Sequence, residues 1–148
     1  MYNDIVKHLK TALASEYQAF HMYRSAHYKI RGPIRPIVKD ELWEHSEEEL
    51  NHANMLEDRI NILGGLTFND YTEWDVWNPS GYDSITSEEP GEILSVIRAS
   101  EEKAIEIYRD IYDKCSGDPV TQDMLLEILA KEEEHLFDVK YNMIGYMV

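Results

Sequence analysis

Apolar residues recur along this chain at intervals of three and four positions, which is the period of an amphipathic helix. The pattern predicts four long helices, over residues from about 4 to 30, from about 37 to 63, from 90 to about 115, and from 119 through 143. Glycine and proline residues at 32–33, 64–65 and 117–119 interrupt the pattern between these segments. On the first helix the predicted apolar face comprises Ile5, Leu9, Ala12, Leu13, Phe20 and Tyr23. We expect no fifth helix after the fourth.

Residues from about 66 to 89 lack this period and are expected to be irregular. A connection of this length is unusual in a compact domain. It is explained if the second and third helices run parallel, so that the chain must cross the full length of the bundle between them. Trp74 and Trp77 are expected to pack this crossover against the helices. The chain is therefore predicted to be one all-α domain over residues 1–148, folded as a four-helix bundle with a long crossover.

Glutamate and histidine replace apolar residues on the predicted inner faces of all four helices. The first and third helices each carry a lone glutamate there, and the second and fourth each carry Glu-x-x-His, whose two side chains share a face. Glu101 is preferred to its neighbour Glu102, which lies on the polar side of its helix. Glu132 is chosen among three consecutive glutamates because it alone precedes His135 by three positions. The six residues are Glu16, Glu49, His52, Glu101, Glu132 and His135.

These residues form a pattern that occurs twice in the chain. Glu49 follows Glu16 by 33 residues, and Glu132 follows Glu101 by 31. The residues 16–23 and 101–108 also match each other as Glu-x-x-Ala-[Phe/Ile]-x-x-Tyr. One Glu-x-x-His in an acidic helical protein is weak evidence for a metal site. Two copies on inner faces, each preceded by an inner-face glutamate, predict a site for two metal ions inside the bundle.

Four carboxylates facing one core would be costly if they stayed charged and unpaired. They must either take up protons or surround cations. Carboxylate and imidazole ligands suit iron, manganese or zinc better than copper(I), and a mixed oxygen and nitrogen set suits iron(II) that meets an oxidant. We expect Glu16 and His52 to serve one ion and Glu101 and His135 the other. Glu49 and Glu132 would then bridge the two ions.

Three further residues are candidates for contact with the ligands. Tyr23 and Tyr108 each lie seven residues after a lone glutamate, about two helical turns along the same face. They would hydrogen-bond a ligand or donate an electron, or serve simply as core tyrosines. His45 lies one turn before Glu49 and would either contact a ligand or line the path by which metal arrives.

The overall charge narrows the possible partners. The formal net charge is −15, from 29 acidic and 14 basic residues, which argues against binding to a nucleic-acid backbone. Acidity alone would only indicate a soluble surface. The single cysteine, Cys115, excludes a cysteine-based zinc site and an internal disulfide. A polar N-terminus and the lack of a long apolar run predict no signal peptide, no membrane span and a cytoplasmic location.

On these motifs the chain resembles the ferritin superfamily, within its bacterioferritin and Dps-like mini-ferritin branches. The resemblance covers nearly the whole chain and includes the first helix, the segments Trp43–His52 and Arg59–Gly65, the long crossover, and the Glu-x-x-His that ends at His135. It implies a ferroxidase centre in each subunit, with two iron ions held by the six residues above and with Fe(II) and O2 or H2O2 as substrates. It also implies a hollow shell of twelve or twenty-four subunits that stores ferric mineral.

The chain departs from these relatives in several ways. Bacterioferritins bind haem through a methionine directly after the second-helix glutamate, and Leu50 stands there, so we expect no haem. The missing fifth helix favours twelve subunits over twenty-four. Some thiol-containing relatives carry a cysteine pair, and Cys115 is alone. DNA-coating relatives often have basic tails, whereas only Lys7 and Lys10 lie near this N-terminus, so sequestration of iron is favoured over DNA binding.

Two other functions remain open from the sequence. The same metal site could serve a di-iron or di-manganese peroxidase, catalase or oxygenase that stores no mineral. A rubrerythrin-like electron-transfer enzyme would need four cysteines for a second module, which this chain does not contain. An acidic bundle that only binds a partner would leave the inner-face carboxylates unexplained.

Overall fold

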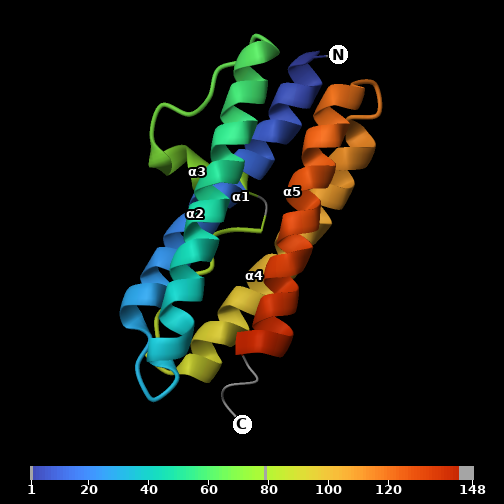
Figure 1. Ribbon diagram of the computed structural model, residues 1–148. Helices are drawn as coiled ribbons and strands as arrows, with labels where there is room; N and C mark the ends of the chain where they lie inside the picture. Colours follow the sequence, from blue (N-terminus) through green and yellow to red (C-terminus); the bar gives the residue numbers. More distant parts are fainter. Residues whose placement is uncertain (1, 79, 144–148) are drawn as a thin grey trace.

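The computed structural model describes residues 2–78 and 80–143, and four long helices form its framework. They are α1 (Tyr2–Lys29), α2 (Arg35–Ile62), α4 (Pro90–Lys114) and α5 (Pro119–Phe137). Helices α1 and α5 run in one direction and α2 and α4 in the other (Figure 1). The predicted all-α bundle is confirmed, and the helices begin within two residues of the expected positions.

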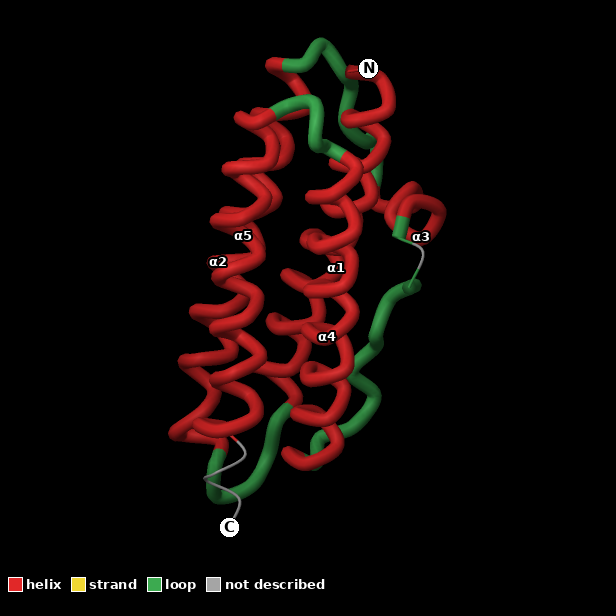
Figure 2. Tube along the Cα trace, turned by 90° about the vertical axis from the view of Figure 1, so that its right-hand side faces the viewer, coloured by secondary structure: helices red, strands yellow, loops and turns green. Residues whose placement is uncertain are grey.

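The connection from α2 to α4 passes along the outside of the bundle from one end to the other, as the parallel course of these helices requires (Figures 1 and 2). It is not wholly irregular, contrary to expectation. A 3-10 turn at Tyr71–Glu73 leads into the one-turn helix α3 (Trp74–Trp77). The turn begins where the Asp70 side chain accepts a hydrogen bond from the backbone N–H of Thr72 and so caps it. A turn this short shows no helical period in the sequence, so the periodicity did not predict it.

Aromatic packing holds the first part of the crossover, as predicted for the two tryptophans. The ring of Trp74 stacks on Tyr17 of α1 with their centroids 5.1 Å apart. Trp77 packs near Phe68, and the ammonium group of Lys10 lies 4.4 Å from the centroid of the Trp77 ring. The crossover is thereby fixed to the outer side of α1.

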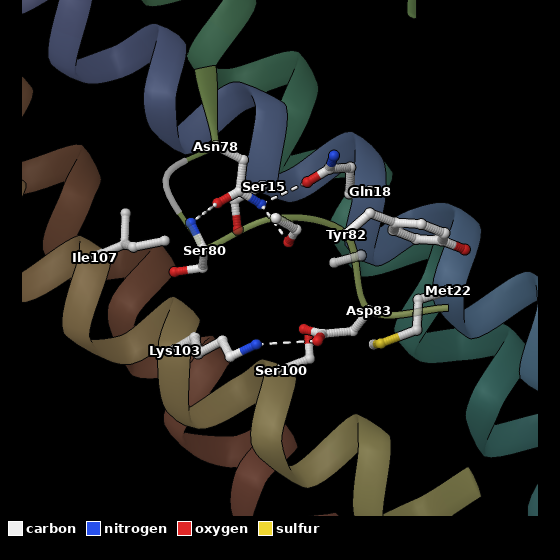
Figure 3. A pocket seen from close by; sticks show the side chains of 12 residues that line it. Ser15, Gln18, Met22, Asn78, Ser80, Tyr82, Asp83, Ser100, Lys103 and Ile107 are labelled. Atoms are coloured by element: carbon white, nitrogen blue, oxygen red, sulfur yellow. Dashed lines mark hydrogen bonds and ion pairs between the residues drawn. The ribbon is translucent and has the colours of Figure 1, made fainter. Parts of the chain in front are cut away.

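Polar contacts hold the second part of the crossover (Figure 3). The Asn78 amide donates hydrogen bonds to the side-chain oxygen of Gln18 on α1 and to the carbonyl of Gly81. Lys103 of α4 points toward Asp83 and pairs with it at 3.0 Å (Figure 3). The crossover is thus attached to α1 and to α4 two residues after the lone glutamate of each helix.

Proline and acidic caps begin α4 and α5. The carboxylate of Glu89 accepts hydrogen bonds from the backbone N–H groups of Gly91 and Glu92, and Asp118 accepts one from Thr121. The predicted start of the last helix at Pro119 is confirmed. Helix α5 continues into a π-helical turn over Asp138–Met143. The expectation of no fifth helix falls on residues 144–148, outside the described residues.

The apolar side chains of the bundle form two clusters, one toward each end. One contains residues such as Met22, Leu42 and Ile97, and the other residues such as Leu9, Leu56 and Ile128. Phe20, expected on the inner face of α1, lies at its flank and is only half-buried, with the Arg24 guanidinium over its ring. Over residues 2–78 and 80–143, no helix has the length and apolar character needed to cross a membrane.

Candidate metal centre

The six polar residues predicted on the inner faces meet between the two apolar clusters. All are buried, and none is more than 4% exposed. They form two overlapping groups whose ligand atoms lie within 4.8 Å of one another in each group. One group is Glu16, Glu49, His52 and Glu132, and the other is Glu49, Glu101, Glu132 and His135. We call Glu16 with His52 the His52 half, and Glu101 with His135 the His135 half. Glu49 and Glu132 are common to both.

The helical period accounts for this meeting. Glu-x-x-His puts a carboxylate and an imidazole one turn apart on the same face of α2 and of α5. Helix α1 packs against α2 and α4, and α5 packs against α4 and α2, so the lone glutamates of α1 and α4 face the same space. The repeated sequence pattern thus becomes two similar half-sites related across the bundle.

Both imidazoles direct the Nδ1 atom at carboxylates. His52 Nδ1 lies 3.0 Å from Glu132, 3.5 Å from Glu16 and 3.7 Å from Glu49. His135 Nδ1 lies 2.9 Å from Glu49, 3.7 Å from Glu132 and 3.8 Å from Glu101. Each imidazole therefore lies near both common carboxylates and the lone glutamate of its own half.

The two predicted tyrosines contact the lone glutamates, but in a crossed manner. The hydroxyl of Tyr23, on the same helix as Glu16, donates to Glu101 at 2.6 Å. The hydroxyl of Tyr108, on the same helix as Glu101, donates to Glu16 at 2.5 Å. Burial and the nearby glutamates raise the pKa of both phenols well above the ordinary value, so they keep their protons and act as donors.

Several buried atoms of the centre have no hydrogen-bond partner among the described residues. They are Glu16 Oε2, Glu49 Oε1, Glu101 Oε2, Glu132 Oε2 and His135 Nδ1. A buried polar atom without a partner costs roughly 1–3 kcal/mol, and more when it is charged. These atoms are the ones that a pair of divalent cations would contact, and carboxylate with imidazole is a donor set that iron, manganese and zinc accept. The residues present therefore fit two such ions.

The crowded carboxylates do not all ionise in the absence of cations. Burial and the neighbouring Glu132 and Glu16 raise the pKa of Glu49 well above its ordinary value. Burial and Glu132 likewise raise the pKa of Glu101 to about 8. Burial and Glu16 also oppose ionisation of Glu132, but the nearby imidazoles of His52 and His135 outweigh them and lower its pKa. Without metal the centre thus holds protons, and any divalent cation that bound there would have to displace them.

The imidazoles also hold protons. Burial opposes a charge on His52, but Glu16 and Glu132 outweigh this effect and raise its pKa to about 10. Burial opposes a charge on His135 as well, and Glu49 contributes most to raising its pKa in spite of this. In the metal-free protein the two protonated imidazoles partly neutralise the charge of the carboxylates around them.

The His135 half has polar neighbours, of which the sequence pointed to one. His45, expected to contact a ligand, stacks on His135 with ring centroids 4.2 Å apart. Sequence reasoning missed Glu48, which lies 2.5 Å from His135 Nε2, and Asp138, which lies 3.1 Å from His45 Nε2. A second three-residue spacing, His45-x-x-Glu48 and His135-x-x-Asp138, was the signal available for both.

A surface pocket opens beside this half. Its volume is about 330 Å³, and its lining includes Glu48, Glu134, His135 and Asp138. The pocket therefore reaches His135, a candidate metal ligand, and most of the side chains that line it are acidic. Divalent cations are attracted to such walls.

Comparisons with known proteins agree on the fold. The family model described as the ferritin-like domain matches residues 6–142. A DNA protection during starvation protein from Pyrococcus furiosus is 32% identical over 128 residues, covering 84% of this chain and 68% of the relative. The structure of a dodecameric thioferritin, the bacterioferritin-related protein from Bacteroides fragilis, superposes with a TM-score of 0.94 at 32% identity and covers 99% of this chain and 88% of that one. A ferritin-like di-iron-carboxylate protein from Bacillus anthracis superposes with a TM-score of 0.81 at 22% identity, covering 96% of each chain.

Proposed function

This chain belongs to the ferritin family, and from that premise we propose that it is a ferroxidase that stores iron. Fe(II) is its substrate, oxidised to Fe(III) at the six-residue centre, and the ferric product accumulates inside a hollow shell of identical subunits. The observation that carries this proposal is the set of buried, unpaired ligand atoms on all four carboxylates and on His135. A structural role in the bundle would not leave so many polar atoms unsatisfied.

The chain's residues have separable tasks in this reaction. Glu49 and Glu132, common to both groups, would hold two Fe(II) ions close together. His52 and His135 would add one nitrogen ligand to each ion. A pair of ions so placed can deliver two electrons to one oxidant molecule, either O2 or H2O2.

The surrounding side chains support this chemistry. The Tyr23 and Tyr108 hydroxyls hold the lone glutamates in place through their crossed hydrogen bonds. The two apolar clusters on either side keep bulk water from the centre. The developing charge of Fe(III) is stabilised by carboxylates that lose their protons as the ions bind.

A shell of twelve subunits is the proposed assembly. The Bacteroides fragilis relative is dodecameric and matches 99% of this chain. The net charge of −15 favours a cation-collecting shell over DNA binding, although the Pyrococcus furiosus relative is named for DNA protection. Haem is not part of the proposal, because Leu50 follows Glu49 where haem-binding relatives have methionine.

The alternative is a di-iron or di-manganese peroxidase, or a related oxidoreductase, with the same centre but no mineral storage. Both functions predict metal at the six residues, and they differ in what happens to iron beyond two ions per subunit. A storage protein continues to take up iron and stays a large particle. An enzyme of the second kind stops at the capacity of its centre.

Aerobic addition of Fe(II) in large excess over two ions per subunit separates these functions. We expect ferric absorbance to develop faster than in buffer alone, and iron to elute with the protein in a large soluble particle on sizing chromatography. Running the assay under O2 and then with H2O2 under argon identifies the preferred oxidant. Oxidation that stops near two ions per subunit, in a protein that elutes small, would replace storage by the alternative.

A further inference from the structure

Two histidine–carboxylate pairs cross between α2 and α5 beside the His135 half. Helix α2 supplies His45 and Glu48, and the other helix supplies His135 and, at the start of the π-helical turn, Asp138. His135 Nε2 lies 2.5 Å from Glu48 Oε2, and His45 Nε2 lies 3.1 Å from Asp138 Oδ2. In each pair the imidazole comes from one helix and the carboxylate from the other, and the two pairs run in opposite directions.

The contacts around His135 hold its ring in one plane. Its face stacks on the His45 ring, with centroids 4.2 Å apart and an angle of 19° between the planes. Tyr23 meets both imidazoles nearly edge-on, at 5.2 Å from His45 and 6.0 Å from His135. With Glu48 at its Nε2 edge, the His135 ring is restrained from three directions.

The contact with Glu48 also selects the tautomer that can bind metal. A carboxylate only accepts hydrogen bonds, so His135 carries a proton on Nε2 and donates it to Glu48. The lone pair of Nδ1 is then available once the proton there is displaced, and Nδ1 is the atom that lies among Glu49, Glu132 and Glu101. A carboxylate bound to the far nitrogen of a metal-ligating histidine orients the ring and makes it a stronger ligand.

The His52 half has no equivalent arrangement. By the spacing of the two Glu-x-x-His motifs, position 131 corresponds to Glu48 and position 128 to His45, and these are Lys131 and Ile128. Lys131 pairs with Glu134 at 2.7 Å instead. Within residues 2–78 and 80–143, the carboxylate contacts of His52 all involve Nδ1, and none involves Nε2.

We propose that Glu48, supported by the His45–Asp138 pair, is a positioning residue for His135 and makes the two metal positions unequal. The ion of the His135 half is bound more tightly than the ion of the His52 half. This inference rests on the proposed function, since it concerns the same centre, but it adds a residue and an order of affinity that the six ligands alone do not predict.

Co2+ binding to the metal-free assembled protein tests this inference, because its visible absorption reports each ion as it binds. In the wild-type protein we expect two ions per subunit in two resolved steps. Glu48→Ala should weaken one step by about 10- to 100-fold and leave the other within about twofold. Glu48→Gln keeps an oxygen acceptor without the charge and should give an intermediate loss. Glu48 is partly exposed, so these substitutions should leave the fold intact.

Single-half backgrounds identify which step belongs to which half. Glu16→Ala leaves only the His135 half complete, and Glu101→Ala leaves only the His52 half. Adding Glu48→Ala should weaken Co2+ binding in the first background and not in the second. The matched control is Glu47→Ala, which removes the same charge from the neighbouring position of α2, where Glu47 pairs with Arg24 rather than with the centre.

Equal weakening in both backgrounds, or equal losses from Glu48→Ala and Glu47→Ala, would show a general effect of charge and overturn the inference. Two bound ions with no effect of Glu48→Ala would overturn it while leaving the proposed function intact. A wild-type protein that fails to bind two Co2+ ions per subunit would remove the basis of both.

Discussion

The two halves of the centre have the same candidate ligands and different neighbours. In each half, one imidazole and one lone glutamate face the common carboxylates Glu49 and Glu132, and one tyrosine hydroxyl donates to the lone glutamate. Around His135 there are in addition a stacked imidazole, two carboxylates and an acidic surface pocket. Equal ligands therefore do not guarantee equal metal affinity.

The difference arises because the repeat is incomplete. The spacing that places ligands on the inner face is preserved in both copies, whereas the flanking positions have diverged to Glu48 in one copy and Lys131 in the other. The π-helical turn that begins at Asp138 continues from α5 and has no counterpart in the middle of α2. A sequence repeat can thus keep the same candidate ligands in both halves while only one half has side chains that position its histidine.

The largest effect should come from removing a carboxylate that both halves use. Glu132→Ala should abolish binding of both ions and reduce Fe(II) oxidation to the rate in buffer, since each ion loses a ligand. Glu101→Ala should remove the ion of one half only and leave about one ion per subunit. Metal content after dialysis against Co2+ and stopped-flow oxidation of Fe(II) measure the two outcomes.

The control for this comparison is Glu102→Ala, which removes an exposed carboxylate adjacent to Glu101 that pairs with Arg98. It should bind two ions and oxidise Fe(II) at the wild-type rate. If Glu132→Ala kept one full ion, Glu132 would belong to one half, and the shared arrangement would be wrong.

Acidity should weaken both halves, but through different groups. Cations at the His135 half must displace the proton of the His135 imidazole and the proton that Glu101 holds below about pH 8. Cations at the His52 half must displace the proton that His52 holds below about pH 10. Because binding releases these protons, affinity should rise with pH, by about tenfold per pH unit for each proton released.

Calorimetric titrations with Zn2+ between pH 6 and 8, in buffers of different ionisation enthalpy, count the protons released. The single-half variants Glu16→Ala and Glu101→Ala assign them to the two halves. Affinity that stays constant over this range would mean that the centre is already deprotonated without metal, contrary to the raised pKa values.

The smallest effect should come from the tyrosines, and it tests their crossed contacts. Tyr23→Phe removes the donor to Glu101 and should weaken the ion of the His135 half. Tyr108→Phe removes the donor to Glu16 and should weaken the ion of the His52 half. Each loss should be about three- to tenfold, which corresponds to one ordinary hydrogen bond of about 1 kcal/mol.

Co2+ titration of the two variants measures these losses, with Tyr112→Phe as the control. Tyr112 is half-buried against the same apolar cluster as Tyr108. Its backbone carbonyl accepts hydrogen bonds from Gln122 and Cys115, whereas within residues 2–78 and 80–143 its hydroxyl makes none. If each substitution instead weakened the ion held by the lone glutamate of the same helix, the crossed hydrogen bonds would not persist in the metal-bound protein.

The helical period made much of the fold predictable. Residues such as Glu16 and Glu49 were found because polar side chains stood out on faces that were otherwise apolar. The parallel course of α2 and α4 followed from the length of the crossover alone, and Figure 1 confirms it. The short helix α3 and the flank position of Phe20 were missed, because a single capped turn has no period and Phe20 lies at the margin of its face.

Contacts between helices could not be predicted in the same way. The repeat placed Tyr23 near its own Glu16 in sequence, yet its hydroxyl reaches Glu101 on another helix. In the sequence Glu48 looked like a surface residue between Glu47 and the inner-face Glu49, and only the packing of α5 brought His135 Nε2 to it. A spacing of three or four residues acts within one helix and can be read from the chain. Which side chains meet across two helices depends on their rotation and depth against each other, and the packing of the whole bundle sets these.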